Sequence, residues 1–315
     1  MFSVVIPLFN KASTIIFSIE SILAQSFSDY EIIIINDGSN DNSVELINNR
    51  FSDNRLRIYN QENQGVSSAR NRGVSESKFD YIAFLDGDDE WLPDYLKKIK
   101  ESIDRFPANG MYCCAGFIQK NNKEKVIRNL KKNENKISEI NVFDNPYIYL
   151  HTSSIVVVKS VFLESGEFPV DLKSNEDIAC FFSISLFTNV VFCGYPLSIY
   201  KLGFSNHLSK VIHYEIPFNL VKRINYVHKK WLTTNKGNRK YVLFTKYEIR
   251  NDIFKFIKSN RFDSVLYIND NISNEIIDLF YFNEFYFFKF KKIKYFSLFY
   301  IICTKLIWKL SRFFY

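Results

Sequence analysis

An alternation between two hydrophobic periods constrains the fold of this 315-residue chain most strongly. In the first hundred residues, short apolar runs are separated by segments whose apolar residues recur with a period near 3.6. The apolar runs cover residues 2–7, 30–36, 56–59 and 81–85. Continuous runs of this kind are typical of strands that are covered on both faces. The alternation predicts an α/β fold with a doubly wound, mostly parallel sheet.

Local signals place the helices of this region and divide the chain. Ser13 is a candidate N-cap for the first helix, and Pro93 lies at a favoured first-turn position. Residues 111–119, 155–158 and 190–193 are predicted strands, 177–188 a helix, and the Lys/Asn-rich run 120–136 a polar loop. We predict one α/β domain over 1–211, with halves 1–110 and 111–211. A helical extension rich in aromatic residues and lysine follows over 212–315.

Composition excludes several classes of protein. The five cysteines lack metal-ligand spacing, so they are expected to be reduced and buried. The net charge of +7 equals the seven Lys and Arg residues of 285–315, a tail without Asp or Glu. The rest of the chain is balanced, which argues against a nucleic-acid partner. The first residues lack the basic and long apolar regions of a secretory signal, and interrupted apolar windows argue against a membrane span.

The fourth apolar run ends in an acidic turn, Asp86-Gly87-Asp88-Asp89. Three carboxylates this close repel one another, so a hard divalent cation is the natural partner. An EF-hand is excluded because its sixth and twelfth positions, counted from Asp86, hold Trp91 and Lys97. A solvated acidic turn remains the alternative for this motif taken alone.

A second acidic turn, at Asp37, follows the second predicted strand. Both turns therefore lie at the carboxyl ends of strands, where doubly wound sheets bind ligands. The sequence contains neither a dinucleotide-binding glycine motif nor a P-loop, so a nucleotide's phosphates need a metal and side chains. An aspartate such as Asp37 suits the ring N–H of a pyrimidine.

These motifs together resemble the family 2 glycosyltransferases, enzymes with the Rossmann-like GT-A fold. The matching blocks cover about two-thirds of the chain and occur in the family's order. They are 4–10 (VVIPLFN), 35–39 (INDGS), 63–73 (NQGVSSARNRG), 84–89 (FLDGDD), 166–168 (GEF) and 175–177 (NED). Each block alone is weak evidence, whereas their order and spacing together are specific.

The resemblance implies a role for each matching residue on the donor side. Pro7 and Asn10 would lie beside the nucleoside, and Asp37 would accept from the base. Arg70 would face the nucleotide. The alternative role for Arg70 is that of a solvent-facing arginine on the surface of a helix.

The resemblance also implies a metal site and a catalytic base. Asp86 and Asp88 match the D-x-D motif and would bind Mn²⁺ or Mg²⁺, with Asp86 toward the ribose or metal. Asp89 is either an acceptor behind the metal or a cap for the helix at Pro93. Asp177 would be the general base of an inverting transfer, with Glu176 as the fallback, although Asp177 is also placed to cap a helix.

One segment departs from the family pattern. Lys201 replaces an arginine, and His207 comes four residues later than the histidine that meets the diphosphate in relatives. Lys201 remains a reasonable point charge for phosphate. His207 either reaches the phosphates or faces solvent. His151 is expected to pack, or to lie on the acceptor side, rather than to act as a ligand.

The resemblance implies an enzyme that moves a sugar from a nucleotide-diphosphate sugar, with UDP favoured by Asp37, to a hydroxyl of a glycan or lipid-linked acceptor. Lipopolysaccharide O-antigen or capsule biosynthesis is the expected setting. Nucleotidyl transfer and a non-catalytic nucleotide-sugar-binding module are the alternatives. The mixed aromatic and basic tail 285–315 predicts an enzyme of the cytoplasm that binds the inner face of the cytoplasmic membrane peripherally. A tail helix packed on the catalytic domain is the alternative.

Overall fold

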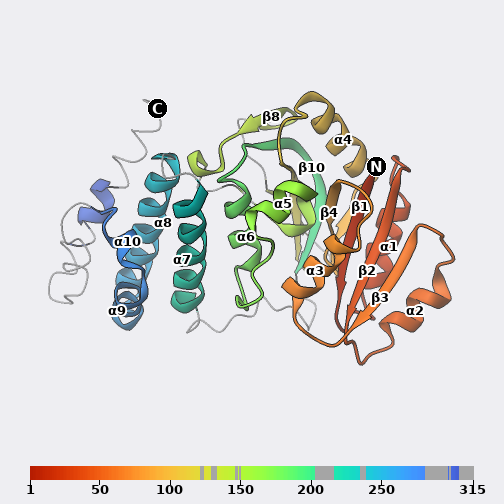
Figure 1. The fold of residues 1–315 in the computed structure, drawn as a ribbon, viewed down its shortest axis with the longest axis horizontal. Helices are drawn as coiled ribbons and strands as arrows, with labels where there is room; N and C mark the ends of the chain where they lie inside the picture. Colours follow the sequence, from red (N-terminus) through yellow and green to blue (C-terminus); the bar gives the residue numbers. More distant parts are fainter. Residues whose placement is uncertain are drawn as a thin grey trace. The chain divides into compact units, whose positions relative to one another are not determined.

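The computed structural model describes residues 1–120, 124–128, 133–145, 148, 150–202, 216–234, 239–280, 297 and 299–304. By their contacts, the residues form two compact units. The first is Met1–Asn141 with Tyr147–Ser209, and the second is Val142–Pro146 with Lys210–Tyr315. The first unit is α/β and the second is helical (Figure 1). The predicted fold class and its helical C-terminal region are therefore confirmed, while the functional halves 1–110 and 111–211 stay a prediction.

The first unit contains one mixed sheet in the order β3-β2-β1-β4-β9-β6-β10-β5, with β7 paired to β6 and β8 to β10. Its strands are β1 (Phe2–Leu8), β2 (Tyr30–Asp37), β3 (Leu56–Gln61), β4 (Tyr81–Phe84), β5 (Glu90–Trp91), β6 (Met111–Lys120), β7 (Glu124–Arg128), β8 (Ile137–Ile140), β9 (Ile155–Val158) and β10 (Val190–Leu202). Strands β1 to β4 pair in parallel, whereas β9 runs antiparallel to both β4 and β6.

Strand β7 corrects the prediction of a polar loop over 120–136. Residues 124–128 pair antiparallel with the end of β6. A strand that joins a neighbour on one side only does not need two apolar faces, so its polar composition concealed it from a search for apolar runs.

Helices cover both faces of the parallel strands. The helices of this unit are α1 (Ile15–Leu23), α2 (Ser43–Arg50), α3 (Val66–Ser75), α4 (Tyr95–Arg105), α5 (Lys159–Ser165) and α6 (Glu176–Ile184). Side chains alternate along β1: Val4 and Ile6 join the core cluster that contains α1 and α4, whereas Val5 faces α3. A Cβ at Gly73 of α3 would come within 2.2 Å of Val5 Cγ1, so this glycine permits the close approach of α3 to β1.

The start of α1 differs from the prediction. Thr14, not Ser13, precedes its first residue. The Thr14 hydroxyl does not cap the helix but donates to the carbonyl oxygen of Gly87 at 2.8 Å. The beginning of α1 is thereby bound to the acidic turn after β4.

Among its described residues, the second unit contains helices with a core of their own. They are α7 (Ile216–Thr234), α8 (Arg239–Lys258), α9 (Phe262–Asn271) and α10 (Asn274–Ile277). Buried aliphatic residues such as Ile224, Ile253 and Ile268 form this core. Within the described part of the chain, no helix is long and apolar enough to cross a membrane. Most of the tail 285–315 lies outside the described residues.

Candidate active site

The candidate site lies where the strand order reverses around β1. The chain moves outward from β1 to β2 and β3, and returns to the other side of β1 with β4. Doubly wound sheets bind ligands at the carboxyl ends of strands at this point. Pro7 and Asn10 belong to the end of β1 and the loop after it, Asp37 ends β2, and Asp86 follows β4. The fold thus brings four of the predicted site residues to one edge.

Asp37 and Asn10 stabilise the loops of this edge. The Asp37 carboxylate accepts from Gln61 Nε2 at 2.7 Å and from the backbone N–H groups of Gln64 and Gly65, both at 2.9 Å. Asn10 has a left-handed backbone, with φ 53°, and its Oδ1 accepts from Asn40 N at 2.9 Å. Asp37 therefore holds the loop that leads into α3, and its contact with a base stays a prediction.

The carboxylates of the acidic turn point toward different partners. Asp86 Oδ1 accepts from Arg70, and Asp88 forms an ion pair with Lys11. Asp89 has no exposed side-chain surface, and its Oδ2 accepts from Ser153 Oγ at 2.6 Å. The turn is therefore stabilised by protein groups, and the alternative of a solvated acidic turn is wrong.

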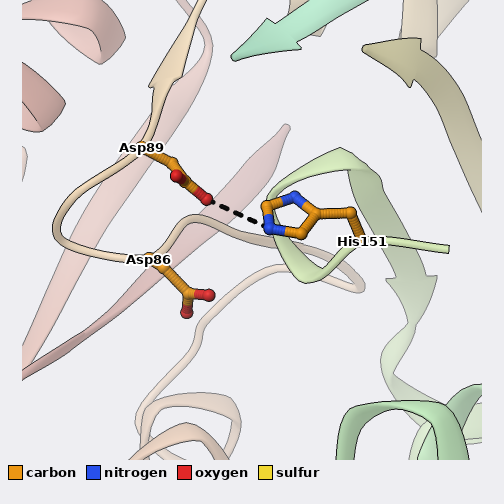
Figure 2. Close-up of side chains that lie close together, drawn as sticks. All are labelled: Asp86, Asp89 and His151. Atoms are coloured by element: carbon orange, nitrogen blue, oxygen red, sulfur yellow. Dashed lines mark ion pairs between the residues drawn. The ribbon is translucent and has the colours of Figure 1, made fainter. Parts of the chain in front are cut away.

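Asp89 and His151 approach each other in the interior of the site. His151 Nε2 lies 3.3 Å from Asp89 Oδ2, and Asp86 lies on the same turn as Asp89 (Figure 2). One ligand atom from each of these three residues lies within 4.8 Å of the other two. Burial lowers the pKa of His151 to about 4, so its imidazole is neutral near pH 7. Burial and the carboxylates Asp88 and Asp86 raise the pKa of Asp89.

This group could hold a metal ion, and it differs from the predicted ligand pair. The predicted ligands are Asp86 and Asp88. In the structure Asp89 and His151 lie with Asp86, whereas Asp88 contacts Lys11. Two carboxylates and an imidazole suit Mn²⁺ better than Mg²⁺, which prefers oxygen ligands. The sequence could not join His151 to Asp89, because the two are distant in the chain.

Arg70 bridges carboxylates from two parts of the chain. Its side chain is only 4% exposed, so the alternative of a helix-surface arginine is wrong. Nη2 donates to Asp86 Oδ1 at 2.8 Å, and Nη1 donates to Glu176 Oε1 at 3.1 Å. The guanidinium also lies 5.1 Å from the ring centre of Phe168. Burial disfavours the charge of Arg70, but Asp86 and Glu176 outweigh it and raise the pKa.

Asp177 occupies the first turn of α6, directly after Glu176. The residue before this helix, Asn175, has a left-handed backbone with φ 60°, a conformation that asparagine tolerates. Asp177 Oδ1 accepts from the adjacent Ile178 N–H at 2.7 Å. Burial and the neighbouring Glu176 charge raise the pKa of Asp177 to about 7, against the opposing effect of Arg70. A carboxylate with this pKa is suited to general-base catalysis near neutral pH.

The structure describes one of the two basic residues predicted near the phosphates. Lys201, at the end of β10, forms an ion pair with Glu90, and its backbone N–H donates to Asp89 Oδ1 at 3.2 Å. Its ammonium is thus paired with Glu90 of β5, the residue that follows the acidic turn. His207 lies outside the described residues.

Sequence reasoning missed Lys11 and Ser153. Ser153 Oγ accepts from the Asp86 N–H at 3.1 Å and donates to Asp89, so this one hydroxyl contacts two residues of the acidic turn. Lys11 follows Asn10 in the loop after β1, and this position close to the end of a predicted strand was the one signal in the sequence. Ser153, between two other buried residues before β9, carried none.

Comparison with known proteins identifies the family. The model of glycosyl transferase family 2 matches residues 3–162. A match over half of the chain is specific, so this chain belongs to glycosyl transferase family 2.

Curated relatives carry consistent names. An uncharacterized glycosyltransferase of Rickettsia bellii is 32% identical over 184 residues, which cover 58% of this chain and 26% of the relative. The glycosyltransferase GlyG of Streptococcus pneumoniae is 41% identical over 111 residues, covering 35% of this chain and 37% of GlyG. The uncharacterized glycosyltransferase YibD of Escherichia coli is 39% identical over 118 residues, covering 35% of this chain and 34% of YibD. The matched region thus spans only about a quarter to a third of each of these relatives.

Solved structures share the fold over almost the whole chain. Staphylococcus aureus TarS 1-349 in complex with UDP-GlcNAc has a TM-score of 0.73 at 15% identity, covering 99% of this chain and 90% of that one. The same protein in complex with UDP has a TM-score of 0.69 at 14% identity, covering 98% and 90%. At this identity the likeness concerns the fold alone, and it confirms the predicted GT-A architecture.

Proposed function

We propose that this protein is an inverting, metal-dependent glycosyltransferase that moves a sugar from a UDP-sugar to a hydroxyl group. The observation that carries the proposal is the Arg70 bridge. One guanidinium contacts both Asp86, at the edge where a nucleotide binds in doubly wound sheets, and Glu176, the neighbour of a basic carboxylate. Family membership and the UDP and UDP-GlcNAc complexes of TarS, a protein of the same fold, support the donor class.

Each side chain has a task in this scheme. The loops after β1 and β2, joined through Asn10, bind the nucleoside, and Asp37 accepts from its base. Asp177 accepts the proton of the acceptor hydroxyl while the oxygen of that hydroxyl attacks the sugar carbon. Arg70 stabilises the excess of negative charge among Asp86, Glu176 and Asp177.

The acidic group after β4 is suited to a divalent cation. Asp86, with Asp89 and His151 or with Asp88, would hold Mn²⁺ or Mg²⁺. Such a cation supplies stabilisation of the charge that develops on the diphosphate leaving group. Asp89 is positioned for this by Ser153 and by the Lys201 backbone.

The proposed acceptor is a glycan or a lipid-linked oligosaccharide of lipopolysaccharide O-antigen or capsule biosynthesis. The basic, aromatic tail 285–315 supports a peripheral position on the inner face of the cytoplasmic membrane, close to such an acceptor.

A direct test measures release of UDP from a panel of UDP-sugars, with Mn²⁺, with Mg²⁺ and with a chelator. We expect cation-dependent hydrolysis of at least one UDP-sugar and transfer when a suitable glycan is added. Formation of UTP and a sugar 1-phosphate when pyrophosphate is added to the UDP-sugar, in place of UDP release, would support a nucleotidyltransferase. Donor binding without turnover over a broad set of acceptors would support a binding module.

A further inference from the structure

Glu176 and Asp177 are adjacent carboxylates with different surroundings. Glu176 Oε1 accepts from Arg70 Nη1 at 3.1 Å, and its side chain is only 13% exposed. The hydrogen bond recorded for Asp177 is that from the Ile178 backbone. The Arg70 side chain donates hydrogen bonds to Asp86 and Glu176. The Arg70 guanidinium is therefore engaged by Asp86 and by Glu176, the residue that precedes Asp177.

Asn71 and Phe168 hold the Arg70 guanidinium in the position from which it binds Glu176. The Asn71 side chain forms two hydrogen bonds with the Phe168 backbone, donating from Nδ2 at 2.9 Å and accepting at Oδ1 at 3.0 Å. The Phe168 ring in turn packs against the Arg70 guanidinium. Helix α3 thus holds both the arginine and the segment that leads to α6, so the guanidinium has little freedom to turn toward Asp177.

We propose that Glu176 is a positioning residue: it binds the Arg70 guanidinium and holds it away from the adjacent Asp177 carboxylate. The inference rests on the proposed function, in which Asp177 is the base. It also gives Glu176 a role distinct from that of a substitute base.

The charges around Asp177 support this role. Burial raises its pKa most, and Glu176 on α6 and the more distant Asp86 after β4 raise it further, whereas Arg70 on α3 and the Ile178 N–H lower it. The Cys180 thiol on α6 is neutral at pH 7, because burial raises its pKa. Loss of the Glu176 charge would leave Arg70 as the dominant nearby charge, and the Asp177 carboxylate would become less basic.

The test follows the titration of Asp177 directly, by carbon-13 NMR of the full chain labelled at aspartate carboxyl groups. The Asp177 signal is assigned by its loss in Asp177→Asn. We expect a midpoint of about 7 in the natural protein. In Glu176→Gln, which keeps size and an acceptor for Arg70, the midpoint should fall by at least about 1 pH unit. Glu20→Gln, at an exposed pair with Arg50, should leave it unchanged.

A second variant distinguishes the loss of the Glu176 charge from a general disturbance of the site. Arg70→Gln removes the opposing charge, so the Asp177 midpoint should rise, opposite to the effect of Glu176→Gln. An unchanged midpoint in folded Glu176→Gln, or shifts in the same direction in both variants, would overturn the inference.

Turnover separates this inference from the proposed function. With the UDP-sugar that is hydrolysed fastest, the acid limb of the kcat profile of Glu176→Gln should move to lower pH. Its plateau should fall only about 3- to 10-fold, because a weaker base transfers protons less well. If the NMR midpoint moves while Asp177→Asn retains full turnover, Asp177 is not the base, yet its coupling to Glu176 stands. A loss of turnover in Glu176→Gln as large as in Asp177→Asn, without movement of the acid limb, would contradict the positioning role.

Discussion

At the scale of single residues, the site is a set of carboxylates that differ in the groups beside them. Asp86 contacts a buried guanidinium, Asp88 an ammonium, and Asp89 a hydroxyl and an imidazole. Asp177 is buried beside the Glu176 carboxylate, and its pKa is about 7 despite the opposing charge of Arg70. One residue type thus supplies both ionised partners of cations and a base that titrates near neutral pH.

Removal of the base should affect turnover more than donor binding. Asp177→Asn is expected to bind a UDP-sugar with nearly natural affinity and to turn over at least ~100-fold more slowly, since the carboxylate acts on the acceptor proton in the transition state. Donor titration calorimetry and initial rates measure the two quantities. Near-natural turnover in this variant, together with a loss in Glu176→Gln, would transfer the role of base to Glu176.

The pH dependence of the natural enzyme should follow the same carboxylate. A general base must be deprotonated, and the Asp177 pKa is raised to about 7. We therefore expect kcat to fall as the pH drops through about 7, tenfold per pH unit well below it. A kcat profile over pH 5 to 9 checks this, and a flat rate down to pH 5 would contradict it.

The metal ligands can be distinguished by paired substitutions. If Asp88 binds the cation, as the D-x-D motif implies, Asp88→Ala should lose the Mn²⁺-dependent part of UDP-sugar binding. If Asp86, Asp89 and His151 bind it, His151→Ala should weaken Mn²⁺ binding by about 10-fold or more. Calorimetric titration of Mn²⁺ in the presence of UDP measures both variants. Lys78→Ala, which changes an exposed lysine outside the site, serves as the control.

At the scale of secondary-structure elements, α3 connects the two sides of the site. Its Gly73 packs on β1, its Arg70 contacts Asp86 and Glu176, and its Asn71 holds the Phe168 backbone. The Asp37 carboxylate, at the end of β2, accepts from the backbone just before this helix. A displacement of α3 would therefore move the donor-side and base-side carboxylates together.

The contact between α3 and β1 can be tested by stability. A methyl group at Gly73 would overlap Val5, so Gly73→Ala should destabilise the protein by about 1–3 kcal/mol. At an unobstructed helix position, replacing glycine by alanine stabilises a protein by about 1 kcal/mol. A destabilising effect of Gly73→Ala would therefore identify the overlap with Val5 as its cause. Urea denaturation measures the change. Ser75→Ala, at an exposed position of the same helix, should stay within about 0.5 kcal/mol. Val5→Ala combined with Gly73→Ala should cost less than the sum of the two.

At the scale of the whole molecule, an α/β unit that holds the candidate site is followed by a helical unit with its own core. The charge of the chain is distributed unevenly between these parts. The tail 285–315 carries seven basic residues and no acidic ones, a surplus equal to the net charge of the protein.

Deletion of residues 285–315 tests the proposed membrane association. Basic residues near an anionic membrane contribute roughly 1 kcal/mol each before screening by salt. The intact protein should therefore sediment with anionic vesicles at low salt and be partly released at high salt, whereas the deleted form should remain in the supernatant and still bind a UDP-sugar. An intact protein that ignores these vesicles, or a deletion that unfolds the catalytic unit, would favour a tail packed on the protein.

The sequence by itself determined the order of strands and helices from β1 to β4, and the motifs at the strand ends. Hydrophobic period is a local property, so β1 to β4 and the acidic turns could be predicted without a structure. Strand β7 was missed because pairing at an edge leaves little periodic signal. Asp86, Arg70 and Asp177 were found as members of motifs, but the contacts of Arg70 with Asp86 and Glu176 were not.

Only the tertiary structure decided which charges meet. Arg70 and Glu176 are 106 residues apart, and Lys11 and Asp88 are 77 apart. Hydrogen bonds and ion pairs act over a few ångströms, so they depend on how the sheet brings distant loops to one edge. The same holds for the basicity of Asp177, because burial and neighbours, rather than the residue type, raise its pKa to about 7.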